Sequence, residues 1–298
     1  MNKNPVITCV GEVLWDALPG GIYLGGAPLN VCLNLNRLGA EARMVSRVGE
    51  DRLGSEAKDR IERGGLDSDF IQVDKEHETG FVKVQLNSDG DPEYVIMQPV
   101  AWDFINLQQK KIVELLENSW AVVYGTLAHR QNHGLRNLSE LSCLKVLDMN
   151  LRAPHFEKDT VLELVKGADI LKMNMDELEL LKSWYSISGS TEKALREIAA
   201  RCSCLTICVT RGGDGAVMLH KRQWFEHGGY PVTVMDAVGA GDAFLAALLY
   251  GLSVDRNQEE LLPLANAAGA YVASQSGANP EYSISDLDSV IEGKLLLQ

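Results

Sequence analysis

The sequence predicts an α/β fold built on a doubly wound, mostly parallel β-sheet flanked by helices. Short apolar runs, typical of buried strands, alternate with longer segments of helical periodicity along most of the 298 residues. Strands separated by helices pair in parallel, because the connecting helix crosses back over the sheet. Polar residues also follow several of these strands directly, at the edge where open α/β sheets bind ligands.

The amino-terminal part begins this pattern. A buried strand is predicted over 6–11. A helix is predicted to begin at Gly25-Gly26-Ala27-Pro28 and to end at Leu38-Gly39, because proline favours the first turn of a helix and glycine its end. A second strand is expected over 43–48, followed by a helix that ends near Arg63.

A second, smaller β-sheet is predicted beside the main one. Residues 80–86 and 93–98 show the alternation of strands, and they flank a turn-forming stretch with no helix between them. A short hairpin is expected near 17–24, where proline and glycine mark a turn. We therefore expect a single domain over 1–298 that carries a small β-sheet lid, formed by about 13–24 and 75–101.

From Leu107 onward the alternation is regular, and it predicts most of the main sheet. Helices are expected over 107–117, 132–141, 158–166, 174–183, 191–201, 240–251, 259–273 and 284–292. Strands are expected over 121–125, 145–148, 169–173, 205–210 and 216–219.

Charge and composition exclude several classes of partner. The net charge of −13 argues against nucleic acid and anionic membrane, because both are polyanions. No apolar run reaches about 18 residues and the first residues lack the apolar core of a signal peptide, so we expect a cytoplasmic protein. The six cysteines lack zinc-ligand spacing, and we expect reduced thiols.

The stretch from Asp236 to Phe244 is the centre of the functional prediction. It places Gly239, Ala240, Gly241 and Asp242 immediately before a run of helix formers. The unpaired N–H groups of a helix start bind anions such as phosphate, and glycine lets them approach the ligand closely. A bound phosphate would repel Asp242 unless this acid takes part in the reaction. The combination favours a kinase in which Asp242 deprotonates an alcohol.

Two other interpretations of this stretch are open. An aspartate in the first turn of an ordinary helix is stabilising by itself. The two glycines also resemble the start of a dinucleotide-binding fingerprint, but Phe244 stands where the third glycine belongs, and no convincing acidic partner follows about 20 residues later. A P-loop enzyme is excluded because the pattern G-x-x-x-x-G-K-[ST] does not occur.

Asp16 and Asn30 are candidates for binding a sugar. Asp16 lies just beyond the first predicted strand, and Asn30 lies in the first turn of the helix that begins near Pro28. A carboxylate accepts hydrogen bonds and an amide both donates and accepts them, which suits neighbouring sugar hydroxyls. The alternative is that Asn30 caps its own helix and Asp16 caps a turn.

Asn174 and Glu177 are candidates for binding magnesium. They follow the strand 169–173 and share one face of the next helical turn. Their oxygens suit Mg²⁺, which keeps most of its waters and is held by one or two carboxylates together with phosphates. The alternative is a capping box made by the same two residues.

Two further segments are candidates for contacting a nucleotide. Thr210-Arg211-Gly212-Gly213 is a glycine-rich turn after a strand, although a β-hairpin alone would explain it. The helix 259–273 carries small residues and Asn266 on one face. Either an adenine ring or a neighbouring helix could approach that face closely.

Together these segments resemble, in order and along nearly the whole chain, the ribokinase-like (PfkB-type) carbohydrate kinases, and within them the fructokinases. Residues 25–31 look like the sugar-side motif, 47–54 resemble the first family signature, 174–177 are similar to the N-x-x-E motif, 210–213 to the nucleotide loop and 236–242 to the D-T-V-G-A-G-D signature. Two positions depart from the pattern. Ala237 replaces a threonine, and Ala101-Trp102-Asp103 replaces a stretch of small residues.

The resemblance implies a role for each candidate residue. Asp242 is the catalytic base, and the anion hole is formed by the amides of Gly239, Ala240, Gly241 and Asp242. The sugar is bound by Asp16, Gly26, Asn30, Trp102, Arg152 and Asp242. The nucleotide is bound by Asn174, Thr210, Gly212, Gly213, Gly239, Gly241 and Asn266. Mg²⁺ is held by Glu177 and by Asn174, through water, and a monovalent cation such as K⁺ is a candidate ligand of Asp236.

The predicted function is ATP-dependent phosphorylation of a primary hydroxyl of a monosaccharide, with fructose as the first choice. Arg152 leaves 2-keto-3-deoxygluconate open as a substrate, because a guanidinium suits a carboxylate better than a hydroxyl. Another sugar or nucleoside kinase of the family is also open, and so is a sugar or nucleotide sensor without catalytic activity. Because edge strands pair readily with a second copy, we expect the lid as the surface of a homodimer.

Overall fold

A nine-stranded β-sheet runs through the computed structural model, which describes residues 5–18, 21–86, 92–132, 135, 138 and 140–295. The strand order is β13-β12-β11-β10-β9-β8-β1-β4-β5. Neighbouring strands from β11 to β5 are parallel, whereas β12 and β13 extend the sheet in antiparallel pairing. The strands are β1 (Val6–Val10), β4 (Glu41–Gly49), β5 (Ile71–Asp74), β8 (Ala121–Gly125), β9 (Leu144–Asp148), β10 (Ile170–Asn174), β11 (Thr206–Thr210), β12 (Ala216–His220) and β13 (Gln223–His227).

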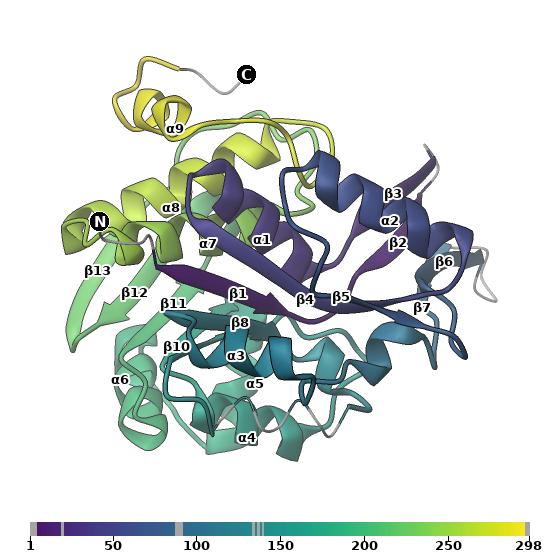
Figure 1. The fold of residues 1–298 in the computed structure, drawn as a ribbon. Helices are drawn as coiled ribbons and strands as arrows, with labels where there is room; N and C mark the ends of the chain where they lie inside the picture. The colour runs from purple at the N-terminus through teal and green to yellow at the C-terminus, as the bar shows by residue number, and fades with distance from the viewer. Residues whose placement is uncertain are drawn as a thin grey trace.

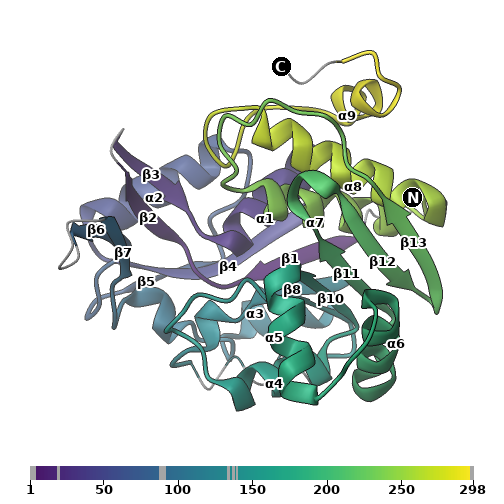
Figure 2. The same cartoon turned by 180° about the vertical axis from the view of Figure 1, so that it is seen from behind.

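Helices cover both faces of this sheet (Figures 1 and 2). One face carries α1, α2, α7 and α8, with α9 packed on α8, and the other carries α3, α4, α5 and α6. The helices are α1 (Ala27–Arg37), α2 (Arg52–Arg63), α3 (Lys110–Glu117), α4 (Lys158–Gly167), α5 (Met175–Tyr185), α6 (Thr191–Cys202), α7 (Ala240–Ser253), α8 (Gln258–Ala273) and α9 (Ile284–Ile291). Short 3₁₀ helices include η1 (Ala101–Phe104), η2 (Leu127–His129) and η4 (Gly212–Asp214).

A separate four-stranded sheet lies beyond the carboxyl end of β1, which leads directly into it (Figure 1). Its order is β3-β2-β6-β7, and its strands are β2 (Leu14–Leu18), β3 (Gly21–Gly25), β6 (Gly80–Leu86) and β7 (Pro92–Ile96). β2 joins its two hairpins by pairing in parallel with β6, Leu14 opposite Gly80. This arrangement confirms the predicted fold class, a large mostly parallel sheet with a small second sheet.

Two strands of the main sheet were not predicted from the sequence. β5 is only four residues long, and β13 is a polar edge strand, so neither has the apolar pattern of a buried strand. The segment 216–219 is the first strand of the antiparallel extension and pairs with β11 as a hairpin. The helix predicted over 132–141 falls partly on residues outside the described ones, and within it Leu135, Leu138 and Glu140 have 3₁₀ conformation.

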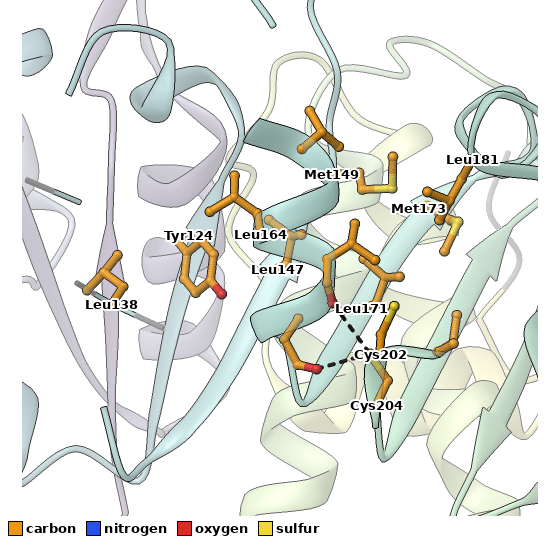
Figure 3. Close-up of a cluster of buried hydrophobic side chains, with 14 of the residues drawn as sticks. Tyr124, Leu138, Leu147, Met149, Leu164, Leu171, Met173, Leu181, Cys202 and Cys204 are labelled. Carbon is orange, nitrogen blue, oxygen red and sulfur yellow. Dashed lines mark hydrogen bonds between the residues drawn. The ribbon is translucent and has the colours of Figure 1, made fainter. Parts of the chain in front are cut away.

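The main core lies between the sheet and the helices α3 to α6, and Figure 3 shows part of it. Tyr124, Leu147 and Leu171 come from adjacent strands and are almost fully buried. The thiol of Cys204 donates to the carbonyl oxygen of Ala168 at 3.0 Å at the edge of this cluster. All six cysteines are free thiols, in agreement with the prediction from their spacing. Within the described ranges, no helix has both the length and the apolar character needed to cross a bilayer.

Candidate active site

The start of helix α7 is the centre of the candidate site. Its N-cap is Gly239, whose φ of +80° is a left-handed conformation that favours glycine. A Cβ atom at this position would also lie 2.6 Å from the carbonyl oxygen of Ala278. Glycine therefore allows the loop before α7 to pack directly against the loop that contains Ala278, and no side chain caps the helix.

Three of the four predicted anion-hole amides are available. Among the described residues, no protein group accepts a hydrogen bond from the N–H of Gly239, Gly241 or Asp242. The N–H of Ala240 instead donates to the carbonyl oxygen of Ala237 at 3.3 Å and closes the preceding turn. Free N–H groups at the positive end of a helix form a site for an anion.

Asp242 is buried in the first turn of α7, and two asparagines hold it there. Asn30, in the first turn of α1, donates from Nδ2 to Asp242 Oδ2 at 2.8 Å. Asn279 in turn donates from Nδ2 to Asn30 Oδ1 at 2.7 Å, which fixes the orientation of the Asn30 amide. Asn30 therefore contacts the acid of α7 instead of capping its own helix, since α1 has no side-chain cap.

Charged groups on the neighbouring strands set the charge of Asp242. Burial is the largest cause that raises its pKa, the negative charge of Asp148 at the end of β9 raises it as well, and the net pKa is about 6. Lys172, Asn30 and Arg152 oppose this rise. Asp242 is therefore a carboxylate at neutral pH, with a proton affinity higher than that of an exposed aspartate.

Lys172 is a buried cation directly beneath the first turn of α7. Its Nζ lies 3.0 Å from each carboxylate oxygen of Asp148. A Cβ atom on Gly241 would lie 3.0 Å from the same Nζ, so glycine leaves the room that this ammonium occupies. Burial lowers the pKa of Lys172, but Asp148, Asp242 and Glu177 outweigh burial and raise it, so the group stays charged.

Arg152 interacts electrostatically with three acids, namely Asp16, Glu12 and Asp242. Arg152, exposed in the loop after β9, lowers the pKa values of Asp16, Glu12 and Asp242. Burial raises the pKa of Asp16, which belongs to β2 of the small sheet, and that of Glu12, to about 7. Gly26 lies beside Glu12: its φ is +120°, and a Cβ there would lie 2.3 Å from the Glu12 carbonyl oxygen.

Asn174 and Glu177 form a capping box at the start of α5. The Asn174 side chain accepts from the N–H of Glu177 at 2.9 Å, and Glu177 Oε2 accepts from the N–H of Asn174 at 2.8 Å. Glu177 Oε1 accepts from the N–H of Leu151 at 2.7 Å, next to Arg152. Burial raises the pKa of Glu177. The structure therefore contains the capping box that the sequence left open, and Glu177 also fixes the loop that carries Arg152.

The remaining nucleotide candidates lie in two separate segments. Gly212 and Gly213 are exposed in η4, and no atom lies within 4 Å of a Cβ built on either residue. Thr210 precedes them at the end of β11. Asn266 is buried in α8, and its Nδ2 donates to the carbonyl oxygen of Leu262 at 2.8 Å. Its side chain is thus bonded to its own helix, and the role of Asn266 toward a nucleotide stays a prediction.

Two further candidates, Trp102 and Asp236, already have protein partners for their side chains. Trp102 has no exposed surface, and the Arg130 guanidinium stacks on its ring at 3.9 Å. A sugar contact with Trp102 therefore stays a prediction that requires this region to open. Asp236 is half-buried, and its two carboxylate oxygens accept from the N–H groups of Val238 at 2.9 Å and Gly277 at 3.2 Å.

Lys172, Glu12 and Asn279 belong to the site by geometry but were not among the predicted site residues. A signal for Lys172 existed, because a lysine stands inside the apolar strand Ile-Leu-Lys-Met-Asn. Such a residue is buried only when a partner compensates its charge. Glu12 directly follows the glycine at the end of β1, which is a ligand-binding position in this class of sheet.

Comparison with known proteins agrees with this site. A family model described as pfkB family carbohydrate kinase matches residues 17–284. The chain belongs to this family. It is therefore a carbohydrate kinase, and the resemblance seen in its motifs is confirmed.

Relatives of this kinase include fructokinases from bacteria and plants. The fructokinase of Escherichia coli is 26% identical over 293 residues, which cover 90% of this chain and 93% of that protein. Fructokinase-1 of Oryza sativa subsp. japonica is 28% identical over 309 residues, with coverage of 93% and 94%. A double-mutant fructokinase from Vibrio cholerae O395, in fructose, ADP and potassium ion bound form, has the same fold, with a TM-score of 0.82, 24% identity and coverage of 98% and 99%.

Proposed function

We propose that this kinase transfers the γ-phosphate of ATP to a primary hydroxyl of a monosaccharide, with fructose as the substrate. The observation that carries the proposal is the position of Asp242, a buried carboxylate in the same helical turn as free amides. A carboxylate beside an anion site has a clear use in a kinase, where an alcohol must lose its proton next to a phosphate.

In this mechanism Asp242 accepts the proton of the sugar hydroxyl while the hydroxyl oxygen attacks the γ-phosphorus in line. Its pKa of about 6 keeps it deprotonated at neutral pH and available as a base. The transition state of phosphoryl transfer is loose, so the proton can leave late. The amides of Gly239, Gly241 and Asp242 stabilise the charge on the transferring group, and each well-placed donor contributes roughly 3–4 kcal/mol.

The sugar lies between the two sheets in this proposal. Asp16 reaches the site from the small sheet, while Asn30 and Asp242 reach it from the helix starts of the main domain. Closure of the small sheet over the sugar would exclude water from the transfer. Glycine is needed at position 26 because a Cβ there would collide with the Glu12 backbone, so this residue can contact a sugar only through its own backbone.

Magnesium fits the residues at the start of α5 only through water. Both oxygens of Glu177 already accept backbone N–H groups, at 2.7 and 2.8 Å, so the carboxylate is better suited to hydrogen bonding with a hydrated ion than to direct coordination. Bound with ATP, the ion would neutralise charge on the phosphate oxygens. Glu177 and Asn174 would then orient its water shell. For a monovalent cation, we propose Asp236 as the candidate ligand.

The choice of fructose is supported by the fructokinases among the relatives. One observation favours 2-keto-3-deoxygluconate as a second candidate. Among the described residues, no carboxylate lies within 4.0 Å of the Arg152 guanidinium as an ion-pair partner. This exposed cation is therefore free to pair with the carboxylate of an acidic sugar.

The test is turnover with ATP on fructose, ribose, 2-keto-3-deoxygluconate and a nucleoside, for the wild type and Asp242→Asn. We expect the highest kcat/KM on fructose, and a loss of roughly 10²–10⁴ in kcat for Asp242→Asn with nucleotide binding retained. Unchanged kcat in this variant would refute the base. Absence of phosphorylation with every acceptor, together with tight sugar binding, would favour the sensor.

A further inference from the structure

Lys172 is buried in the middle of a central strand, where an apolar residue is the ordinary choice. Its neighbours Leu171 and Met173 point into the core beneath α4 to α6, so the lysine side chain points to the opposite face, toward α7. The side chain extends to the first turn of that helix, where its Nζ is 3.0 Å from the position of a Cβ on Gly241.

Stability does not account for this buried charge. The Lys172–Asp148 pair joins β10 to β9 with both N–O distances at 3.0 Å, and both side chains are more than nine-tenths buried. Removing two charges from water costs about as much as their attraction returns, so a well-packed apolar pair would serve the fold equally well. A function in the site is the better explanation of why the pair is there.

The groups that face Asp242 show what this function is. They are Asp148 from β9, Lys172 from β10, Arg152 from the loop after β9 and Glu12 from the segment after β1. Three buried acids, Asp242 included, therefore share this space, and the buried Glu177 of α5 also acts on Lys172, while Arg152 is exposed and Lys172 is a buried cation. Without Lys172, the base would lie in a pocket dominated by negative charge.

We infer that Lys172 is a positioning residue for phosphoryl transfer: its ammonium, held by Asp148 beneath Gly241, is the countercharge that keeps Asp242 a carboxylate. This inference rests on the proposed role of Asp242 as the base. Asp148 holds the ammonium in place beneath Gly241. Its own charge has the opposite effect on Asp242, because a nearby negative charge favours protonation of that acid. Gly241 provides the space for the ammonium and leaves its N–H free for the phosphate.

The two members of the pair should therefore have opposite effects on the pH profile. In Lys172→Gln, the acid limb of kcat/KM for fructose should move up by about one pH unit, which corresponds to a tenfold loss on the acid side and recovery at alkaline pH. In Asp148→Asn, the same limb should move down, because the removed charge is the one that raises the pKa of Asp242. Lys172→Arg, which retains the charge, should restore the limb toward the wild-type position.

The matched control is Lys145→Gln. Lys145 and Asp169 form another lysine–aspartate ion pair, at 2.7 Å, at the opposite end of the same two strands. This variant should leave the acid limb unchanged. Thermal unfolding of each variant measures any loss of fold. If Lys172→Gln does not fold, the pH profiles of Asp148→Asn and Lys172→Arg still test the role of Lys172.

The inference is overturned if Lys172→Gln lowers kcat/KM by the same factor at every pH. It is also overturned if Asp148→Asn moves the acid limb in the upward direction. Either result would disprove the role of Lys172 but not the proposed function. The role of Asp242 as the base is tested separately, by the turnover of Asp242→Asn. If Asp242→Asn loses turnover while the pair variants leave the acid limb in place, the base is correct and Lys172 has only a structural role.

Discussion

Asn30 donates a hydrogen bond to Asp242 across 212 positions of sequence, at 2.8 Å, and so joins the first turn of α1 to the first turn of α7. The two helices lie side by side on one face of the main sheet (Figure 2). The contact brings a residue of the predicted sugar site to the predicted base. A sugar held by Asn30 would therefore have its hydroxyls next to the carboxylate that we propose as the base.

Asn30→Ala should reduce kcat by about tenfold or more, because a hydrogen bond to a charged group is worth roughly 1.5–3 kcal/mol. The variant removes the donor that lowers the pKa of Asp242 and leaves the amide of Asn279 without its acceptor. Steady-state kinetics at neutral pH, with fructose and ATP varied separately, measures the loss.

The control for this variant is Asn34→Ala, one turn further along α1. Asn34 is also buried and hydrogen-bonded, since it accepts from the Tyr282 hydroxyl at 2.7 Å and donates to the carbonyl oxygen of Asn30 at 2.8 Å. Its loss should lower the melting temperature but leave kcat near the wild-type value. Equal kinetic losses in the two variants would mean that Asn30 acts only through the packing of α1.

Asp242→Asn should stabilise the fold at alkaline pH. Burial raises the pKa of Asp242 from 3.8 to about 6, so the folded state binds this proton more tightly than the unfolded state. The contribution of Asp242 to stability is therefore highest below its unfolded pKa and falls as pH rises from about 4 to about 6. Asparagine removes this penalty, which we expect to be about 2–3 kcal/mol at pH 8 and small at pH 4.

Urea unfolding of the wild type and Asp242→Asn at several pH values measures this effect. Glu12→Gln is the companion variant, because burial raises the pKa of Glu12 from 4.5 to about 7. Its stabilisation should develop over a window that extends to higher pH. A difference between wild type and Asp242→Asn that is the same at pH 4 and pH 8 would contradict the titration of a buried acid.

The sequence predicted those parts of the site whose residues are close together in the chain. The glycines and acid at 239–242 could be assigned to a helix start, because glycine, small residues and helix formers follow one another there. Asn174 and Glu177 could be recognised as either a cap or a metal site for the same reason. The sheet order at the β4–β5 end and the β13 edge depended on short or polar strands, which carry little periodic signal.

Contacts between distant segments could not be predicted in this way. The bonds from Asn279 to Asn30 and from Asn30 to Asp242 join two helix starts and one loop that meet only in the folded chain. The orientation of Trp102 could not be predicted either, because an aromatic residue outside a periodic pattern can face either a ligand or the core. Here it lies in the core, and Arg130 stacks on its ring.

The edge of the small sheet should mediate a homodimer. β3 is an edge strand of that sheet and exposes Ile22 and Tyr23 at 48% and 45%. An exposed apolar edge pairs readily with a second copy. We expect sedimentation velocity at about 50 μM to show a dimer that the double variant Ile22→Lys, Tyr23→Lys converts to a monomer.

Val254→Lys is the control for this surface. Val254 is equally exposed, at 48%, but lies at the end of α7, so this variant should leave the dimer intact. A wild type that sediments as a monomer would disprove this surface.

Gly213→Ala should weaken ATP binding without affecting the fold. No protein atom lies within 4 Å of a Cβ on Gly213, and its φ lies outside the left-handed region, so the structure itself does not require glycine there. If the nucleotide approaches this loop through its backbone, an added methyl group would collide with the ligand instead. We expect the KM for ATP to rise about tenfold, with an unchanged melting temperature and an unchanged KM for fructose.

Gly228→Ala is the matched control for this loop. Gly228 also has open space at its Cβ and a φ outside the left-handed region, but it follows β13 and is not part of the predicted nucleotide motif. Its KM for ATP should equal that of the wild type. Because neither glycine is needed by the fold, a difference between the two variants in ATP binding alone has to come from contact with the nucleotide. A KM for ATP that stays at the wild-type value in Gly213→Ala would place the nucleotide away from Gly213.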